Sequence, residues 1–224
     1  MEHLISQEKI LELGRKITKH KGAVGIFFEV GANDGISQSN TLVLEKKLKW
    51  NGILVEPIPS SYEQLKLNRP NCKLFNNFLC NDKKQKKIIM KYDHGDKLMA
   101  SVYIKKFFEF KRFKKVEVES ANFNSIVEKS NFKQIDFLSL DVEGFEIEIL
   151  KSIDFEKYEP YVILIEVWKE KSFEIFDFLT KKNYIAVENF SNFDKNINLN
   201  WSEDHQDFLF IKKNYSRYFF DEKY

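Results

Sequence analysis

The chain lacks several features that would assign a protein class at once. It has only two cysteines, Cys72 and Cys80, in 224 residues. Two cysteines do not make a disulfide scaffold, so we expect buried free thiols in a reducing compartment. No run of about 18 apolar residues is present, which argues against a transmembrane helix, and residues 1–20 lack the apolar segment of a signal peptide. These absences predict a soluble, cytoplasmic protein without membrane insertion.

The chain also lacks an excess of charge of one sign. It has 36 Lys and Arg against 34 Asp and Glu, a formal net charge of +2. Such a balance does not predict binding to nucleic acid or to a membrane surface. Residues 105–115 mix Lys with Phe, but the Phe spacing fits a packed helical stripe better than stacking on bases. We therefore expect no nucleic-acid partner.

Apolar runs alternate with segments of helical periodicity, and there is no internal repeat. Strands are expected at 25–30, 53–55, 72–79, 135–140, 161–165, 184–190 and 207–211, with Asn51-Gly52 as a turn. Helices are expected at 3–21, after an N-cap at Ser39 or Asn40, after Ser60 or Ser61, and at 122–128, 146–152 and 172–181. Extra strands are expected at 86–91 and 116–119.

This alternation predicts an α/β fold with a mostly parallel, doubly wound sheet of seven strands, an antiparallel edge and helices on both faces. Apolar residues make up 43% of the chain, including 22 Phe, enough for a sizeable core. We expect a single domain over residues 1–224. Residues 93–115 are the least regular stretch and are expected to form a lid or substrate-recognition insertion.

The most informative motif is FFEVGANDG at residues 27–35. An apolar strand carries Glu29 near its end, and Gly31 and Gly35 let the backbone turn tightly beside a ligand. The spacing is not that of the G-x-G-x-x-G fingerprint, so a pyrophosphate cradle is poorly supported. Glu29 and Asn33 suit a cationic amino-acid group better, because carboxylates repel a pyrophosphate. An ordinary strand-to-helix turn is the alternative.

The second expected strand ends at Glu56-Pro57, about 20 residues after Gly35. A carboxylate at this position accepts hydrogen bonds from two ribose hydroxyls in dinucleotide folds, and Pro57 constrains the path of the chain. Asn81 and Asp82 follow the third strand, where an adenine amino group could be held. A surface Glu before a turn is the less favoured alternative, so the sequence predicts a nucleoside site.

Carboxylates also follow two later strands. Asp141 and Glu143 come just after the strand at 135–140, and Glu166 ends the next strand. Such a set could act as general base for a hydroxyl or hold a divalent cation. We favour function for Asp141, whereas a helix cap competes for Glu143. His205 precedes the last strand; a solvated loop position is its first interpretation and a catalytic role its second.

Together these segments resemble the FkbM family of S-adenosylmethionine-dependent methyltransferases. The matching blocks are FEVGANDG at 28–35, LVEPIP at 54–59 and DFLSLDVEG at 136–144. The resemblance implies a Rossmann-like class I methyltransferase fold, S-adenosylmethionine as cofactor, and O-methylation, commonly of a sugar hydroxyl in a glycan or secondary metabolite. It implies cofactor contacts at Glu29, Gly31, Asn33 and Glu56, and we extend this set to Gly35, Pro57, Asn81, Asp82 and Asp141.

Two departures from the family pattern stand out. Ser139-Leu140 precede Asp141, where the family often has Lys-Ile or Lys-Cys, and residues 37–41 resemble one branch of the family. The acceptor does not carry over from the resemblance, because the variable lid determines it.

The predicted catalytic residues are Asp141, Glu166 and His205. We expect the sulfonium methyl to point toward Asp141 and Glu166, where a carboxylate takes the proton of the attacking hydroxyl. Some sugar O-methyltransferases of similar fold use Mg²⁺, which gives Asp141 and Glu166 as candidate metal ligands. One alternative is an NAD-dependent sugar oxidoreductase, but no suitable glycine pattern or Tyr/Lys pair is found. The other is a non-catalytic binding module, against which the retained carboxylates argue.

Overall fold

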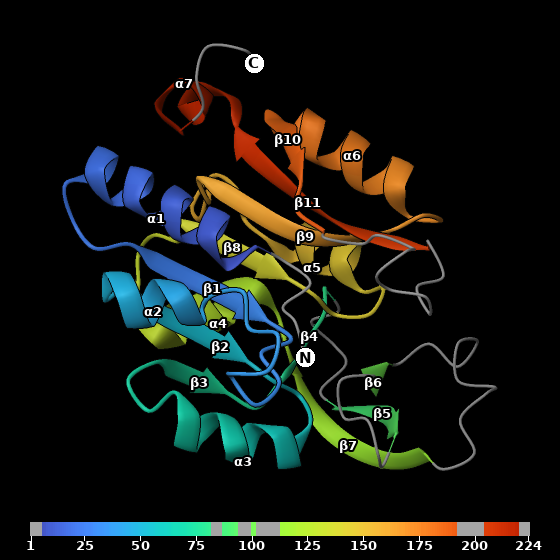
Figure 1. Ribbon diagram of the computed structural model, residues 1–224. Helices are drawn as coiled ribbons and strands as arrows, with labels where there is room; N and C mark the ends of the chain where they lie inside the picture. The colour runs from blue at the N-terminus through green and yellow to red at the C-terminus, as the bar shows by residue number, and fades with distance from the viewer. Residues whose placement is uncertain (1–5, 82–86, 94–99, 102–112, 192–203, 220–224) are drawn as a thin grey trace, which may run out of the picture.

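The computed structural model describes residues 6–81, 87–93, 100–101, 113–191 and 204–219. A large twisted sheet forms the middle of the molecule, helices cover it, and a smaller sheet lies beside it (Figure 1). The predicted α/β fold is therefore confirmed.

The large sheet has seven strands in the order β10-β11-β9-β8-β1-β2-β3. Five of them, β3, β2, β1, β8 and β9, run parallel, and β11 is antiparallel to both β9 and β10. The strands are β1 (Ile26–Val30), β2 (Asn51–Val55), β3 (Lys73–Phe75), β8 (Phe137–Leu140), β9 (Val162–Trp168), β10 (Tyr184–Asn189) and β11 (His205–Lys212). The expected antiparallel edge is present.

Each face of this sheet has its own apolar core. One face packs against α1 (Gln7–Lys21), α2 (Leu42–Leu48) and α3 (Pro59–Asn68), and the other against α4 (Phe123–Ser130), α5 (Glu146–Ser152) and α6 (Ser172–Lys181). Alternate strand residues supply the two cores, as the pleat requires: Phe27 faces the first group and Phe28 the second. A 3-10 turn (Lys213–Tyr215) and α7 (Ser216–Phe219) end the described chain. No helix in these ranges is long and apolar enough to cross a membrane.

Local signals explain the ends of α1. The Ser6 hydroxyl accepts a hydrogen bond from the Lys9 amide at the first turn, and Gly22 ends the helix in the left-handed region at φ +67°. The last helical residue, Lys21, pairs with the buried Asp136 at 2.6 Å, and the same carboxylate oxygen accepts from the Ile26 amide. One carboxylate therefore joins α1, β1 and the start of β8.

The smaller sheet has the order β4-β7-β5-β6. Its strands are β4 (Phe78–Leu79), β5 (Lys87–Asp93), β6 (Ala100–Ser101) and β7 (Phe113–Ala121). Its core includes Ile58 from the loop after β2, and Phe145 from the loop after β8 packs against it. The rings of Phe78 and Phe145 meet edge to face with centroids 4.9 Å apart. The small sheet thus supports both loops that follow the central strands.

Several predicted boundaries are wrong. Asn51-Gly52 is not a turn but the beginning of β2, because both residues pair in parallel with β1. Neither Ser39 nor Asn40 caps α2. Its N-cap is Thr41, whose side chain makes no capping hydrogen bond to the helix. Helix α3 begins at Pro59 rather than at a serine, since proline is pre-set for the first helical position.

Other predicted boundaries hold or lie partly outside the described residues. The helices at 146–152 and 172–181 are confirmed to the residue as α5 and α6. Most of the expected lid at 93–115 and residues 3–5 of the first helix lie outside the described ranges. Both cysteines are free; Cys80 is buried and Cys72 half-buried.

Gly52→Ala should destabilise the fold. A Cβ built on Gly52 would lie 1.9 Å from Cε2 of Phe27, which is fully buried on the neighbouring strand and has no room to move. Overpacking of this kind costs about 1–3 kcal/mol of unfolding free energy, measurable by urea denaturation. Gly22→Asn is the control, because nothing lies within 4 Å of its Cβ position and Asn tolerates the left-handed region. Equal midpoints for both variants would contradict this packing.

Candidate cofactor and active site

The turn after β1 brings two sequence motifs into contact. The amides of Gly31 and Ala32 both donate to the carbonyl oxygen of Val55 at 3.1 Å. Gly31 adopts φ +86°, and a Cβ there would lie 1.9 Å from the carbonyl oxygen of Asp141. Only glycine permits this approach. The turn at 31–35 therefore lies directly beside the loop that begins at Asp141.

Glu56 connects the turn to the end of β2. Its carboxylate is 5% exposed and accepts from the amides of Asn33 at 2.9 Å and Ile58 at 2.7 Å. Burial raises the pKa of Glu56 to about 7, although the two amide bonds oppose the rise. A carboxylate offers about four lone-pair sites, so Glu56 can hold Asn33 and still accept from ribose hydroxyls.

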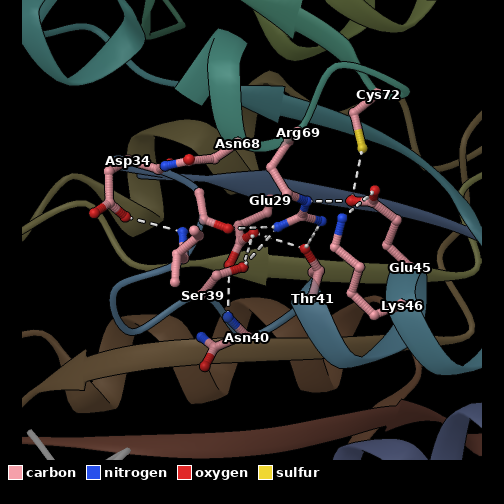
Figure 2. A network of polar contacts seen from close by, with 12 residues as sticks. Glu29, Asp34, Ser39, Asn40, Thr41, Glu45, Lys46, Asn68, Arg69 and Cys72 are labelled. Carbon is pink, nitrogen blue, oxygen red and sulfur yellow. Dashed lines mark hydrogen bonds and ion pairs between the residues drawn. The ribbon is translucent and has the colours of Figure 1, made fainter. Parts of the chain in front are cut away.

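Glu29 is buried and fully engaged within the protein. One carboxylate oxygen accepts from the amide of Asn40 at 2.7 Å, and the other from the hydroxyls of Ser39 at 2.9 Å and Thr41 at 2.6 Å (Figure 2). The side chain, which the resemblance assigns to the cofactor, therefore organises the loop at 39–41. Its direct contact with the cofactor stays a prediction.

Arg69, just after α3, is the buried cation of this network. It has no exposed surface, pairs with Glu45 of α2, and donates to the hydroxyls of Ser39 at 3.0 Å and Thr41 at 3.3 Å (Figure 2). It also donates to the carbonyl of Gly35 at 3.0 Å. Burial alone would raise the pKa of Glu45, but the guanidinium outweighs burial and lowers it. The loop at 35–41 is thus held between one cation and one anion.

Buried carboxylates gather where β8 and β9 end and β11 begins. Glu166 of β9 lies opposite Asp207 of β11 in the antiparallel register. Burial raises the pKa of Asp141 to about 6 and that of Asp207 to about 7. The pKa of Glu166 rises well above its usual value, through burial and then through the charges of its acidic neighbours, Asp141 first. Asp141 and Asp207 therefore titrate near neutral pH.

His205 belongs to this cluster. It begins β11 opposite Trp168, and the two ring centroids are 4.6 Å apart. Its Nε2 lies 3.7 Å from Glu166 Oε1, and its Nδ1 lies 2.9 Å from a carboxylate oxygen of Asp204. The solvated-loop interpretation of His205 is therefore wrong, because strand pairing places the ring beside Glu166. The indole N–H of Trp168 donates to the other Glu166 oxygen at 2.6 Å.

Comparison with protein families identifies the chain. The model of the methyltransferase FkbM domain matches residues 29–186. The chain belongs to the FkbM methyltransferase family. S-adenosylmethionine is accordingly its methyl donor, and the family span includes Glu29, Glu56, Asp141 and Glu166. Among curated proteins, none matches the chain in sequence.

Three solved structures similar to this FkbM methyltransferase are methyltransferases by their descriptions. The METTL16 methyltransferase domain is 10% identical, with a TM-score of 0.51 over 90% of this chain and 64% of that one. A precorrin-6y C5,15-methyltransferase from Geobacter metallireducens is 10% identical, with a TM-score of 0.48 over 95% of this chain and 92% of that one. Aeropyrum pernix fibrillarin, solved with natively bound S-adenosyl-L-methionine, is 10% identical, with a TM-score of 0.49 over 84% of this chain and 66% of that one. At this identity the METTL16 likeness shows the class I methyltransferase fold alone.

The residues of the FkbM methyltransferase fit its cofactor. Glu56 retains acceptor capacity at the end of β2, and the Gly31 turn presents backbone where a side chain would collide with Asp141. The acids at the ends of β8 and β9 provide the negative surroundings that a sulfonium cation favours. Glu56, Asn33 and the Gly31 turn would therefore hold the nucleoside, and Asp141 would lie toward the reacting end.

The same geometry does not fit Mg²⁺. Within the described ranges, no group of three or more Asp, Glu, His or Cys side chains is arranged to hold a metal ion. Asp141 and Glu166 alone do not form such a group, and one Glu166 oxygen already accepts a hydrogen bond from the Trp168 indole N–H. The predicted metal site is therefore not supported, and the chemistry is derived from side chains alone.

The remaining predicted residues are placed as follows. Pro57 follows Glu56, and its carbonyl accepts from the Asn76 amide group at 3.0 Å. Gly35 turns at φ +79° against Arg69. Asn81 is exposed after β4, and Asp82 lies outside the described residues.

Two buried acids were not assigned a role from sequence. Glu146 accepts through one oxygen from the amides of Val142 at 3.1 Å and Gly144 at 3.0 Å. The predicted cap role of Glu143 is wrong, because the N-cap of α5 is Phe145. Asp207 could have been found from the period of two along β11, which places it on the same face as His205.

Arg69→Met should strongly destabilise the protein. It leaves Glu45 buried without its cation, and breaking a buried pair typically costs about 3–5 kcal/mol of unfolding free energy. Urea denaturation would measure the loss. Lys66→Met is the matched control, since the Lys66–Glu63 pair is exposed and worth at most about 1 kcal/mol. Similar small shifts for both variants would show that the buried pair does not hold the fold.

Proposed function

We propose that this FkbM methyltransferase transfers a methyl group from S-adenosylmethionine to a hydroxyl of a sugar, within a glycan or a glycosylated metabolite. The observation that carries the proposal is the pair Asp141 and Glu166 at the carboxyl edge of the sheet. Burial raises the pKa of Asp141 to about 6, so its carboxylate is ionised at neutral pH and still basic enough to accept a hydroxyl proton.

The carbohydrate acceptor is supported by the family resemblance, in which sugar hydroxyls are common targets. Family membership also removes the reason to consider an NAD-dependent oxidoreductase. A non-catalytic module is disfavoured because Asp141 and Asp207 interact with each other and have pKa values raised to about 6 and about 7, as is common for acids in active sites.

The chain's own residues divide the work of the reaction. The bound cofactor supplies an electrophilic methyl group on a sulfonium centre. Asp141 takes the proton from the acceptor hydroxyl, and the interaction with His205 lowers the pKa of Asp141 against the larger effect of burial. Burial and the charges of neighbouring acids raise the pKa of Glu166, which favours a protonated carboxyl group that can donate a hydrogen bond to the acceptor. The indole N–H of Trp168 donates to one oxygen of this group and fixes its orientation. Most of the acceleration comes from this positioning.

Asp141→Asn should reduce methyl transfer by about 10²–10⁴-fold, because it removes the general base. Transfer of a radiolabelled methyl group to candidate carbohydrates measures the rate, and calorimetry with S-adenosylhomocysteine should still show binding. The wild-type rate should rise with pH through about 6 and then level, since Asp141 must lose its proton first. The variant should lack this rise.

Glu166→Gln is the comparison, because an amide keeps the ability to donate a hydrogen bond. Its loss of rate should be smaller than that of Asp141→Asn. If Asp141→Asn retains wild-type turnover, the assignment of the base is wrong.

Glu56→Ala should weaken S-adenosylhomocysteine binding by about 10–100-fold, because hydrogen bonds to a charged group are worth about 1.5–3 kcal/mol. Titration calorimetry measures the change directly and needs no acceptor. Glu63→Ala, on the exposed side of α3, is the control and should bind normally. An unchanged dissociation constant for Glu56→Ala would show that Glu56 does not bind the ribose hydroxyls.

A further inference from the structure

Asn40 has a buried oxygen without a hydrogen-bond partner in the described structure. The residue is 4% exposed and lies in the loop before α2. Its amide N–H donates to Glu29 at 2.7 Å, and its side-chain Nδ2 donates to the hydroxyl of Ser139 on β8 at 3.0 Å. Its Oδ1 is buried and accepts no hydrogen bond from any residue in the described ranges.

A buried acceptor without a hydrogen bond destabilises the folded protein. Leaving a buried acceptor unpaired costs about 1–3 kcal/mol, and most buried polar groups in proteins are satisfied. Reversing the side-chain amide does not solve the problem, because the other amide atom then lacks a partner. Asn40 is held firmly on two sides, so it cannot simply turn away. The free atom therefore indicates that a partner is missing.

The position of Asn40 relates it to the cofactor site. Ser139, its partner, pairs with Glu29 in the β1–β8 register and precedes Asp141 by two residues. The charge of Glu29 acts on Asp141, which places both carboxylates in one region. Glu56 lies at the end of β2, two strands from β8 in the order β2-β1-β8, which is roughly 10 Å at the usual strand spacing. Asn40 thus lies across β1 from the proposed ribose partner.

The charges around Asn40 select the kind of partner. Glu29 accepts from the backbone amide of Asn40, so a carboxylate lies next to this residue (Figure 2). An anionic group would be repelled there, and a cation would be attracted. Glu29 already accepts three hydrogen bonds within the protein, whereas Asn40 Oδ1 accepts none from the described residues. Asn40 Oδ1 is therefore the acceptor with the most unused capacity for a cation.

We infer that Asn40 Oδ1 accepts a hydrogen bond from the α-ammonium group of the cofactor's methionine part. Glu29 supports this contact through its charge and by fixing the loop, and does not make the contact itself. A short chain through the sulfur joins the ribose to the amino acid in the cofactor, so Glu56 and Asn40 hold its two ends on either side of β1. The inference rests on the cofactor of the family and not on the proposed sugar acceptor.

The test compares two probes that differ at one group. S-adenosylhomocysteine carries the α-ammonium group, and its deaminated analogue has hydrogen in that position. Calorimetry should show that Asn40→Leu weakens binding of S-adenosylhomocysteine by about 10-fold or more, as expected for one hydrogen bond to a charged group. Binding of the deaminated analogue should not change. Asn40→Asp, which keeps an oxygen acceptor, should retain binding of S-adenosylhomocysteine.

Ser139→Ala is the matched control, because it removes the partner of Nδ2 and leaves Oδ1 in place. It should affect both probes equally. If Asn40→Leu weakens both probes by the same factor, Asn40 only shapes the loop and the inference is overturned. Unchanged binding of both probes overturns it as well. Asn40→Ser serves if the leucine variant does not fold. If the wild-type protein does not bind S-adenosylhomocysteine, both the cofactor assignment and the inference are wrong. If the protein binds it but does not methylate sugars, only the proposed acceptor is wrong.

Discussion

The buried charge of Arg69 is the constraint on which the cofactor end of the sheet depends. A guanidinium without solvent must have its donors satisfied, since an unpaired buried charge costs several kcal/mol. Its partners come from separate parts of the chain: Glu45 from α2, and Gly35 and the Ser39 hydroxyl from the loop after β1. Arg69 therefore fixes α2, the end of α3 and this loop relative to one another, and the loop in turn carries Asn40 and donates to Glu29 of β1.

This arrangement separates the acids into two groups with different chemistry. Glu29 and Glu45 are saturated by donors or by a cation and serve the framework. Glu56 and Asp207 are buried and Asp141 is half-buried. None of the three forms an ion pair with a Lys or Arg within the described ranges, and removal from solvent raises their pKa values to between about 6 and 7. The carboxylates that titrate near neutral pH therefore belong to the second group.

The predictions from sequence succeeded where local pattern and tertiary position agree. The bounds of helices α5 and α6 and a mostly parallel sheet with an antiparallel edge follow from periodicity and from the alternation of elements. They failed where a contact distant in sequence decides the outcome. Asn51-Gly52 has the composition of a turn, but pairing with β1 makes it strand, and glycine is needed because the Phe27 ring lies against it. Pairing of β11 with β9 likewise moved His205 from a predicted loop to the side of Glu166.

The sequence by itself determined the fold class, the family and the strand ends at which functional carboxylates occur, because these depend on residue type and spacing along one segment. Only the tertiary structure decided which carboxylates are free to act. Glu29 and Glu56 have similar positions at the ends of neighbouring strands, but Glu29 accepts three hydrogen bonds from residues 39–41, whereas Glu56 accepts two backbone amides and keeps more acceptor capacity. Hydrogen-bond saturation depends on which loops meet at a site, and that requires the packed chain.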